Sequence, residues 1–175
     1  MSASPSPLTI RTATGADAVA FCAIYNPYVR NTTISFETQP VDEAEMRRRI
    51  HEKQQRHAWL AAEVDGQIAG YAYYGPFRPR PAYDHTVESA IYIAGHQAGK
   101  GYGRLLYTAL IDSAYLRGYR EMIAVIALPN PASLALHLAL GFREVGVLQH
   151  VGRKFDCDVD VCLWQKSLDA GQGSL

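Results

Sequence analysis

The stretch that decides the fold reads Gln97-Ala98-Gly99-Lys100-Gly101-Tyr102-Gly103-Arg104. It follows an apolar segment, residues 86–93, that predicts a strand, and it leads into a periodic segment that predicts a helix over residues 103–117. Glycines let backbone N–H groups turn toward a ligand, and a helix N-terminus adds unpaired donors and a partial positive charge. The stretch therefore predicts a strand–turn–helix unit that holds a phosphate or pyrophosphate, with Lys100 and Arg104 adding charge-assisted bonds.

Two other phosphate-binding loops fit this stretch poorly. A P-loop needs a glycine at the position of Ala94 and a Ser or Thr after Lys100, where this chain has Gly101. A dinucleotide-binding fingerprint follows the first strand of its domain, whereas this loop lies mid-chain and its third glycine comes one place early. A plain glycine-rich turn remains the alternative, and the flanking Gln97 and Arg104 favour a binding loop.

The segments on either side of the loop predict the remaining elements. Before it we expect a strand at 8–11, a helix from Thr14 to about Tyr25 that stops near Asn26-Pro27, a helix from Asp42, and strands at 59–64 and 67–74 joined by a hairpin turn at 65–66. After it we expect a strand at 122–128, a helix at 131–140, and strands at 144–151 and 159–164. The order β-α-α-β-β-β-α-β-α-β-β predicts an α/β (α+β) domain with a single mixed sheet and helices on its faces.

Composition favours one packed domain over residues 1–175, with flexible tails at 1–7 and 169–175. Hydrophobic residues make up 48% of the chain and charged residues 19%, which is enough for a core. The formal net charge is zero, so the chain has no bulk electrostatic reason to bind nucleic acid or an anionic membrane. No apolar run approaches the ~20 residues that span a bilayer, and the first residues do not read as a signal peptide.

Cysteine usage is sparse and points to a reducing compartment. Cys22, Cys157 and Cys162 form neither a disulfide framework nor a zinc motif. The sequence therefore predicts a cytoplasmic protein with no metal site.

The glycine loop and the segment after it resemble the GNAT N-acetyltransferase superfamily. Gln97-x-x-Gly99-x-Gly101 is similar to the acetyl-CoA pyrophosphate loop of that superfamily, and Asn130-Pro131-Ala132-Ser133, Leu136-His137 and Gly141-Phe142 are similar to its next segment. The resemblance spans residues 8–168. It implies a mostly antiparallel sheet with helices on both faces, and acetyl-CoA as co-substrate.

Other segments resemble the phosphinothricin N-acetyltransferase subfamily more closely. They are Ile24-Tyr25-Asn26, Thr33-Ile34-Ser35-Phe36-Glu37, Arg78-Pro79-Arg80-Pro81-Ala82-Tyr83, Thr86-Val87-Glu88 and Gly152-Arg153-Lys154-Phe155. This resemblance implies a homodimer that acetylates the α-amino group of phosphinothricin, methionine sulfoximine or methionine sulfone. The chain departs from the subfamily at Asp158, where a Trp is usual, and this change bears on the acceptor pocket.

The resemblance also implies the residues that hold the coenzyme. The superfamily's splayed strand corresponds to Ile91, Tyr92 and Ile93, whose backbone groups would hold the pantetheine and polarise the thioester. The pyrophosphate would lie over Gln97, Gly99, Lys100, Gly101, Tyr102, Gly103 and Arg104. Asn130 and Ser133 would hold the coenzyme's arm, and a plain helix cap is a compatible role for Asn130.

Two residues are the candidates for proton transfer. Glu88 lies in a mostly apolar strand, where desolvation raises the pKa of a carboxylate and suits it to act as a base; a rim Glu in an ion pair is the alternative. His137 lies in an otherwise apolar helix, at the point where many GNAT enzymes carry the acid that protonates the leaving thiolate. A core or cap histidine is the alternative for His137.

A proline-stiffened loop before Glu88 supplies the candidates for substrate binding. Arg78 and Arg80 would grip a carboxylate or phosphinate, and Tyr83 and Phe36 would wall the pocket. A solvated basic loop is the alternative. For the whole protein, two rival functions stay open: acetylation of a protein or peptide terminus, and a non-catalytic sensor of acetyl-CoA. Short loops without a charged groove argue against the first, and the presence of both Glu88 and His137 argues against the second.

Overall fold

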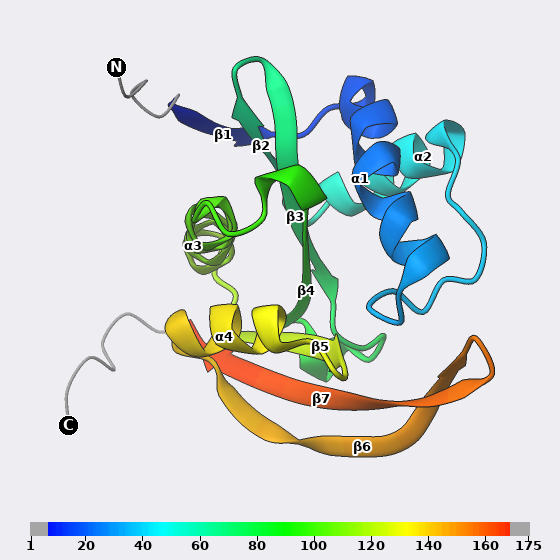
Figure 1. Ribbon diagram of the computed structural model, residues 1–175. Coiled ribbons are helices and arrows are strands. Elements are labelled where there is room, and N and C mark those ends of the chain that lie inside the picture. The colour runs from blue at the N-terminus through cyan, green and yellow to red at the C-terminus, as the bar shows by residue number, and fades with distance from the viewer. Residues whose placement is uncertain (1–6, 169–175) are drawn as a thin grey trace.

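A seven-stranded sheet organises residues 7–168, the part of the chain that the computed structural model describes (Figure 1). The strand order is β1-β2-β3-β4-β5-β7-β6, and every neighbouring pair is antiparallel except β4–β5. The strands are β1 (Leu8–Thr12), β2 (Trp59–Val64), β3 (Gln67–Pro76), β4 (Thr86–Ile93), β5 (Glu121–Ala127), β6 (Arg143–Lys154) and β7 (Cys157–Ser167). The predicted mixed, mostly antiparallel sheet is confirmed. The expected tails lie outside the described residues, apart from Pro7.

Helices cover both faces of this sheet (Figure 1). One face carries α1 (Ala18–Asn31) and α2 (Glu43–Gln54), and the other carries α3 (Tyr102–Leu116) and α4 (Pro131–Ala139). Three short 3-10 turns complete the chain: η1 (Gly15–Asp17), η2 (Pro81–Tyr83) and η3 (Gly95–Gln97).

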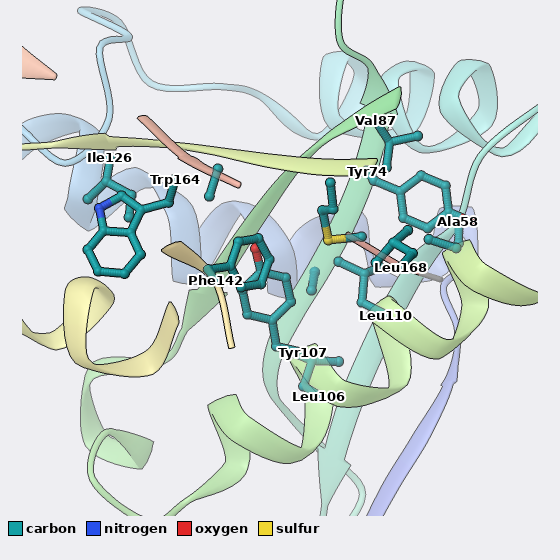
Figure 2. Close-up of a cluster of buried hydrophobic side chains, with 14 of the residues drawn as sticks. Ala58, Tyr74, Val87, Leu106, Tyr107, Leu110, Ile126, Phe142, Trp164 and Leu168 are labelled. Atoms are coloured by element: carbon teal, nitrogen blue, oxygen red, sulfur yellow. The ribbon is translucent and has the colours of Figure 1, made fainter. Parts of the chain in front are cut away.

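Alternation along the strands divides the core into two clusters. Ala61 of β2 points to the α1–α2 face, whereas its neighbour Ala62 points to the α3 face. Figure 2 shows the α3-side cluster, in which Leu106 and Leu110 pack under the sheet and Tyr107 rises from α3. Tyr107 is fully buried on the inner side of α3, beside the apolar residues that the helical pattern predicted there.

The prediction that the first helix stops near Asn26-Pro27 is wrong. Helix α1 continues through Pro27 to Asn31. A proline inside a helix removes one backbone hydrogen bond, and burial of Val29 beyond it favours continuation. Asn26 does not end the helix, because its side-chain amide exchanges two hydrogen bonds of 2.9 Å with the backbone of Val41. These bonds tie α1 to the loop that precedes α2.

Local signals for the other elements are confirmed. Asp42 caps α2 by accepting a hydrogen bond from the Glu45 N–H, and Asp65 and Gly66 both have positive φ in the tight β2–β3 turn. The hairpin of β6 and β7 is longer than the predicted strands. Its tip leaves the sheet and packs against the loop after α1, where the Lys154 Nζ donates a 2.6 Å hydrogen bond to the carbonyl of Ser35.

Candidate active site

The parallel strands β4 and β5 separate partway along their length. Their pairing ends at Ser89 and Ala124, so the β5-facing backbone groups from Ala90 to Ile93 have no ladder partner. A cavity of about 320 Å³ opens between the diverging strands, bounded by the glycine loop on one side and α4 on the other. We call this cavity the β4–β5 cleft. The Ile93 carbonyl accepts a 2.6 Å hydrogen bond from the Tyr28 hydroxyl, and the other β5-facing backbone groups of this stretch face the cleft, where an extended ligand could bind them.

The glycine loop forms one end of the β4–β5 cleft. Gly99 and Gly101 have φ values of 76° and 84°, which an L side chain adopts only with strain, and Gly101 caps the N-terminus of α3. A Cβ added at either glycine would meet nothing within 4 Å, so the space beside the loop is open. Backbone N–H groups and a helix N-terminus facing open space suit a phosphate or pyrophosphate.

Most of the predicted coenzyme residues gather at this cleft. Those that line it are Ile91, Tyr92, Ile93, Gln97, Gly99, Gly101, Tyr102, Gly103, Asn130 and Ser133. Lys100 and Arg104 are exposed and are not among the lining residues; the Lys100 Nζ donates to the Gln97 Oε1 at 2.8 Å. Asn130 is also a helix cap, because its Oδ1 accepts a hydrogen bond from the Ser133 N–H at 3.2 Å.

A chain of hydrogen bonds closes the side of the cleft formed by α4. The hydroxyls of Ser89 and Tyr107 are 2.7 Å apart, the Tyr107 hydroxyl is 3.0 Å from the His137 Nε2, and the His137 Nδ1 is 2.7 Å from the carbonyl of Ser133. A carbonyl only accepts, so Nδ1 carries the imidazole proton and Nε2 accepts from Tyr107. We call this the Ser89–Tyr107–His137 chain.

Burial keeps this chain neutral. His137 is only 3% exposed, and desolvation lowers the pKa of its imidazole. Desolvation also raises the pKa of the Tyr107 phenol. His137 therefore borders the β4–β5 cleft as a neutral ring with both nitrogens engaged.

The side chain of Glu88 projects from the face of β4 opposite to the face that carries Ser89. It pairs in register with Gly75 of β3, and it faces the α1–α2 layer. Glu88 is half-buried, and desolvation raises the pKa of its carboxyl, whereas the positive charges of Lys53 and then Arg78 lower it. A carboxylate with a raised pKa in a partly dry site is suited to accept a proton near neutrality.

Aromatic and polar side chains surround the space beside Glu88. Tyr73 and Tyr92 lie on the same side of the sheet, and burial raises the pKa of both phenols. The loop after α1 is fastened to the helices of this layer, because the Tyr25 hydroxyl lies 2.6 Å from the Ser35 Oγ and Arg49 pairs with Glu37. Glu88 and His137 therefore lie on opposite faces of β4.

The predicted substrate-binding residues occupy two separate places. On the loop after β3, the Arg78 guanidinium lies 5.0 Å from the Phe77 ring centroid, and the Tyr83 ring packs edge-on against the same Phe77. Arg80 is exposed and precedes η2. Phe36 packs elsewhere, against Gly152 of β6, where an added Cβ would clash with its ring.

Asp158, the departure from the subfamily pattern, lies near the tip of the β6–β7 hairpin. Its carboxylate accepts a 3.0 Å hydrogen bond from Arg153, the residue opposite it in register. Both side chains are largely exposed. The negative charge is therefore already partnered by Arg153.

Three residues of the site were not predicted. The hydrogen-bond partners of Ser89 and Tyr107 are distant in sequence. The one available signal was that Ser89 directly follows Glu88, so the two side chains must project from opposite faces of the strand. Lys53 lies in the last turn of a strongly charged helix, where the sequence pattern suggests a solvated cation.

Among residues 7–168, no group of three His, Cys, Asp or Glu side chains is arranged to hold a metal ion. Within the same range, no helix is both long and apolar enough to cross a bilayer.

Comparisons with known proteins agree on the family. Residues 10–163 match the acetyltransferase (GNAT) domain family. The chain is 41% identical over 169 residues to the phosphinothricin N-acetyltransferase of Streptomyces viridochromogenes, covering 97% of this chain and 92% of that protein. It is 39% identical over 164 residues to the L-methionine sulfoximine/L-methionine sulfone acetyltransferase of Pseudomonas paraeruginosa, covering 92% and 95% of the two chains.

A solved structure adds a ligand to this comparison. A GNAT superfamily phosphinothricin acetyltransferase from Sinorhizobium meliloti, determined in complex with AcCoA, superposes with a TM-score of 0.90. The two proteins are 35% identical, and the match covers 96% of this chain and 92% of the other.

Proposed function

The chain belongs to the GNAT acetyltransferase family and is an acetyl-CoA-dependent N-acetyltransferase, and we propose that its acceptor is the α-amino group of phosphinothricin, methionine sulfoximine, methionine sulfone or a close analogue. The observation that carries this acceptor class is the half-buried carboxylate of Glu88 with the positive charges of Lys53 and Arg78 around it. A small amino acid presents the complementary pattern, an ammonium beside one or more anionic or polar groups. The relatives described above are named for acceptors of this kind.

The β4–β5 cleft holds acetyl-CoA in this proposal. The pyrophosphate lies over the glycine loop, with Lys100 and Arg104 at its outer edge, and the pantetheine runs along Ile91, Tyr92 and Ile93, on the edge of β4 that no longer pairs with β5. Support for this comes from the end of the β4–β5 pairing at Ser89 and the open space beside Gly99. Asn130 and Ser133 flank the coenzyme's arm from α4.

Glu88 is the base of the proposed reaction. It takes the proton from the acceptor ammonium, and the freed amine attacks the thioester carbonyl carbon directly. The carbon–sulfur bond then breaks, and coenzyme A leaves as a thiolate that takes up a proton. The raised pKa of Glu88 supports this role, because it makes the carboxylate a stronger base toward the acceptor ammonium.

The role of His137 as the acid for the thiolate stays a prediction, and its contacts favour positioning. Its one imidazole proton is held by the Ser133 carbonyl, and its other nitrogen accepts from Tyr107. A neutral ring bound at both nitrogens fixes the wall of the β4–β5 cleft without releasing a proton.

The acceptor lies between Glu88, the loop after β3 and the tip of the β6–β7 hairpin in this proposal. Arg78 and Arg80 bind the polar terminus of its side chain, and Tyr83 and Phe36 wall the pocket. The exposure of both guanidiniums supports a site that is completed by ligand. Asp158, paired with Arg153, adds little net charge to this pocket.

We propose further that the whole chain is a single GNAT domain that works as a cytoplasmic homodimer. The free thiols of Cys22, Cys157 and Cys162 fit a reducing compartment. The edge strand β6 exposes apolar side chains that a second copy would cover: Val145, Val147, Leu148 and Val151. Size-exclusion chromatography with light scattering measures the mass of the assembly. A monomer mass at micromolar concentration would contradict the proposed dimer.

An acceptor panel tests the proposed function. We expect kcat/KM for phosphinothricin, methionine sulfoximine or methionine sulfone to exceed that for an arylalkylamine or a peptide N-terminus. A preference for the arylalkylamine or the peptide would overturn the acceptor class and leave the acetyl-CoA chemistry intact. Binding of acetyl-CoA without thioester consumption on any acceptor would favour the sensor instead.

A further inference from the structure

Lys53 reaches from the last turn of α2 to the sheet beside Glu88. Its Nζ lies 5.1 Å from the centroid of the Tyr73 ring, and it would lie 2.8 Å from a Cβ built on Gly75. Gly75 is the residue of β3 that pairs with Glu88. The absence of a side chain at Gly75 therefore leaves room for the ammonium next to the carboxylate of the proposed base.

Among residues 7–168, no oxygen or nitrogen accepts a hydrogen bond from this ammonium, whose one partner is the Tyr73 ring. In the described part of the chain, Lys53 makes no side-chain hydrogen bond and no ion pair within 4.0 Å, whereas Arg47, Arg48 and Arg49 of the same helix are all paired with glutamates. Lys53 is half-buried, and desolvation lowers the pKa of its ammonium. A partly desolvated cation without an acceptor is costly unless a ligand supplies one.

Open space lies beside the ammonium. Lys53 and Tyr73 line a cavity of about 290 Å³ between α1, α2 and the sheet, and α2 also contributes Arg49 and Glu52 to its lining. Among the described residues, the charges that act on Lys53 are those of Glu88 on the sheet and of Arg49 and Glu52 on its own helix. Glu88 is not among the residues that line this cavity; its proximity to the ammonium rests on Gly75, which the Lys53 Nζ approaches and which pairs with Glu88.

We propose that Lys53 binds the α-carboxylate of the acceptor while Glu88 receives its α-ammonium. This inference rests on the proposed function, because it assumes an α-amino acid as acceptor. Lys53 of α2 approaches Gly75, the β3 partner of Glu88, so a positive and a negative charge lie beside each other and match the two charges of a zwitterion. Arg78 and Arg80 are then left for the terminus of the acceptor's side chain. Lys53 is a specificity residue that the sequence pattern did not reveal.

The competing role for Lys53 is purely electrostatic. Its charge lowers the pKa of Glu88, so its removal raises that pKa and shifts the acid limb of the rate profile to higher pH. Such an effect is the same for every acceptor amine. Binding of the carboxylate affects only acceptors that carry one, which separates the two roles.

The experiment compares methionine sulfone with the matching amine that lacks the α-carboxylate. Both are assayed with wild type, Lys53→Met, Lys53→Arg and the control Arg47→Met, which removes a cation from the outer side of the same helix. Rates are taken on the high-pH plateau of each variant, so that the ionisation of Glu88 does not enter. Thermal melts verify that every variant is folded.

Lys53→Met should lower kcat/KM for methionine sulfone by about 10- to 100-fold, mainly through KM, because one charge-assisted bond is lost. It should change kcat/KM for the amine by no more than about threefold. Lys53→Arg should retain most of the preference for the carboxylate, and Arg47→Met should behave as wild type. Gly75→Ala, which displaces the Lys53 Nζ, should lose part of the preference.

Each other outcome has a distinct meaning. If wild type shows no preference for the carboxylate, the proposed acceptor class fails and this inference fails with it. If wild type has the preference and folded Lys53→Met keeps it, the carboxylate is bound elsewhere and only this inference is overturned. Equal losses for both acceptors would assign Lys53 to Glu88 alone, which also overturns it.

Discussion

The two sides of β4 differ although they are set by consecutive residues. Glu88 points to the α1–α2 layer, where charged groups face one another without direct bonds: its own carboxylate and the ammonium of Lys53. Ser89 points to the α3 layer, where every polar group of the Ser89–Tyr107–His137 chain is hydrogen-bonded and neutral. The charges on the Glu88 side lack direct hydrogen-bond partners, whereas the polar groups of the chain on the Ser89 side are all hydrogen-bonded.

The contrast indicates what each side does. Uncompensated charges in a partly desolvated space are unfavourable, so they indicate where a charged ligand binds. A fully bonded neutral chain stabilises the geometry around it and needs no ligand. We therefore expect substitutions on the Glu88 side to change activity more than stability, and those on the Ser89 side to change stability more than activity.

The largest effect is expected at Glu88. Glu88→Gln keeps the shape and removes the base, so kcat should fall by about 10²–10⁴-fold at neutral pH and recover partly at high pH, where free amine is abundant. In wild type, the rate should rise with pH through a pKa above the ordinary 4.5 of a Glu carboxyl, because burial raises it. Rate profiles with pH check both statements. Full activity of Glu88→Gln across pH would show that the base lies elsewhere.

The glycine loop gives the next largest effect. Gly101→Asp places a carboxylate beside the proposed pyrophosphate and a side chain on a residue with φ of 84°, so the Kd for acetyl-CoA should rise about 10-fold or more. Gly101→Ala separates strain from charge and should cost less. Isothermal titration measures both. Unchanged affinity in folded Gly101→Asp would remove the coenzyme from this loop.

On the Ser89 side, His137 should matter chiefly for stability. His137→Leu leaves the Tyr107 hydroxyl and the Ser133 carbonyl without their partner, and should lower the free energy of unfolding by about 2–3 kcal/mol at neutral pH. The pKa of folded His137 lies below 6.5, so its contribution is full above pH 6.5 and is lost as pH falls through the folded value. Denaturant titrations at several pH values test this. A loss of kcat with no loss of stability would instead support the proton-donor role.

Tyr107→Phe should have a smaller effect than His137→Leu. It removes the donor to the His137 Nε2, while the Ser89 hydroxyl keeps a second acceptor, the Ile123 carbonyl at 3.2 Å. We expect a loss of about 1–2 kcal/mol in the free energy of unfolding and a change in kcat/KM below about threefold. A tenfold or larger drop in kcat would show that the Tyr107 hydroxyl takes part in proton transfer.

The smallest effect is expected at Asp158. Its pair with Arg153 is exposed, so Asp158→Asn should change stability by less than about 0.5 kcal/mol. Because Arg153 already balances the charge, the kcat/KM ratio between phosphinothricin and methionine sulfone should change less than about twofold. A larger change in that ratio would show that the charge of Asp158 acts on the bound acceptor despite its pairing with Arg153.

Elements and most cleft residues were predictable, because local signals define them. Period-two strands, the Asp42 cap and the glycine loop each act within a few residues. The end of α1 was not predictable, since Asn26 is satisfied by Val41, a partner outside the helix. The polar partners of Tyr107 and Lys53 lie on other elements, so a helical pattern classifies the first as core and the second as surface.

The bond from Lys154 to the Ser35 carbonyl joins residues 119 positions apart. The β4–β5 cleft, by contrast, draws nearly all its lining from residues 89–137. Contacts between distant positions form late, because closing a long loop costs more entropy before any contact repays it. Strand β5, one side of the cleft, nevertheless pairs along its whole length with β7, so the cleft is complete only once β7 has been synthesised. A chain cut before β7 should therefore lose acetyl-CoA binding together with any selection among amines, because both sides of β4 depend on the same late strand.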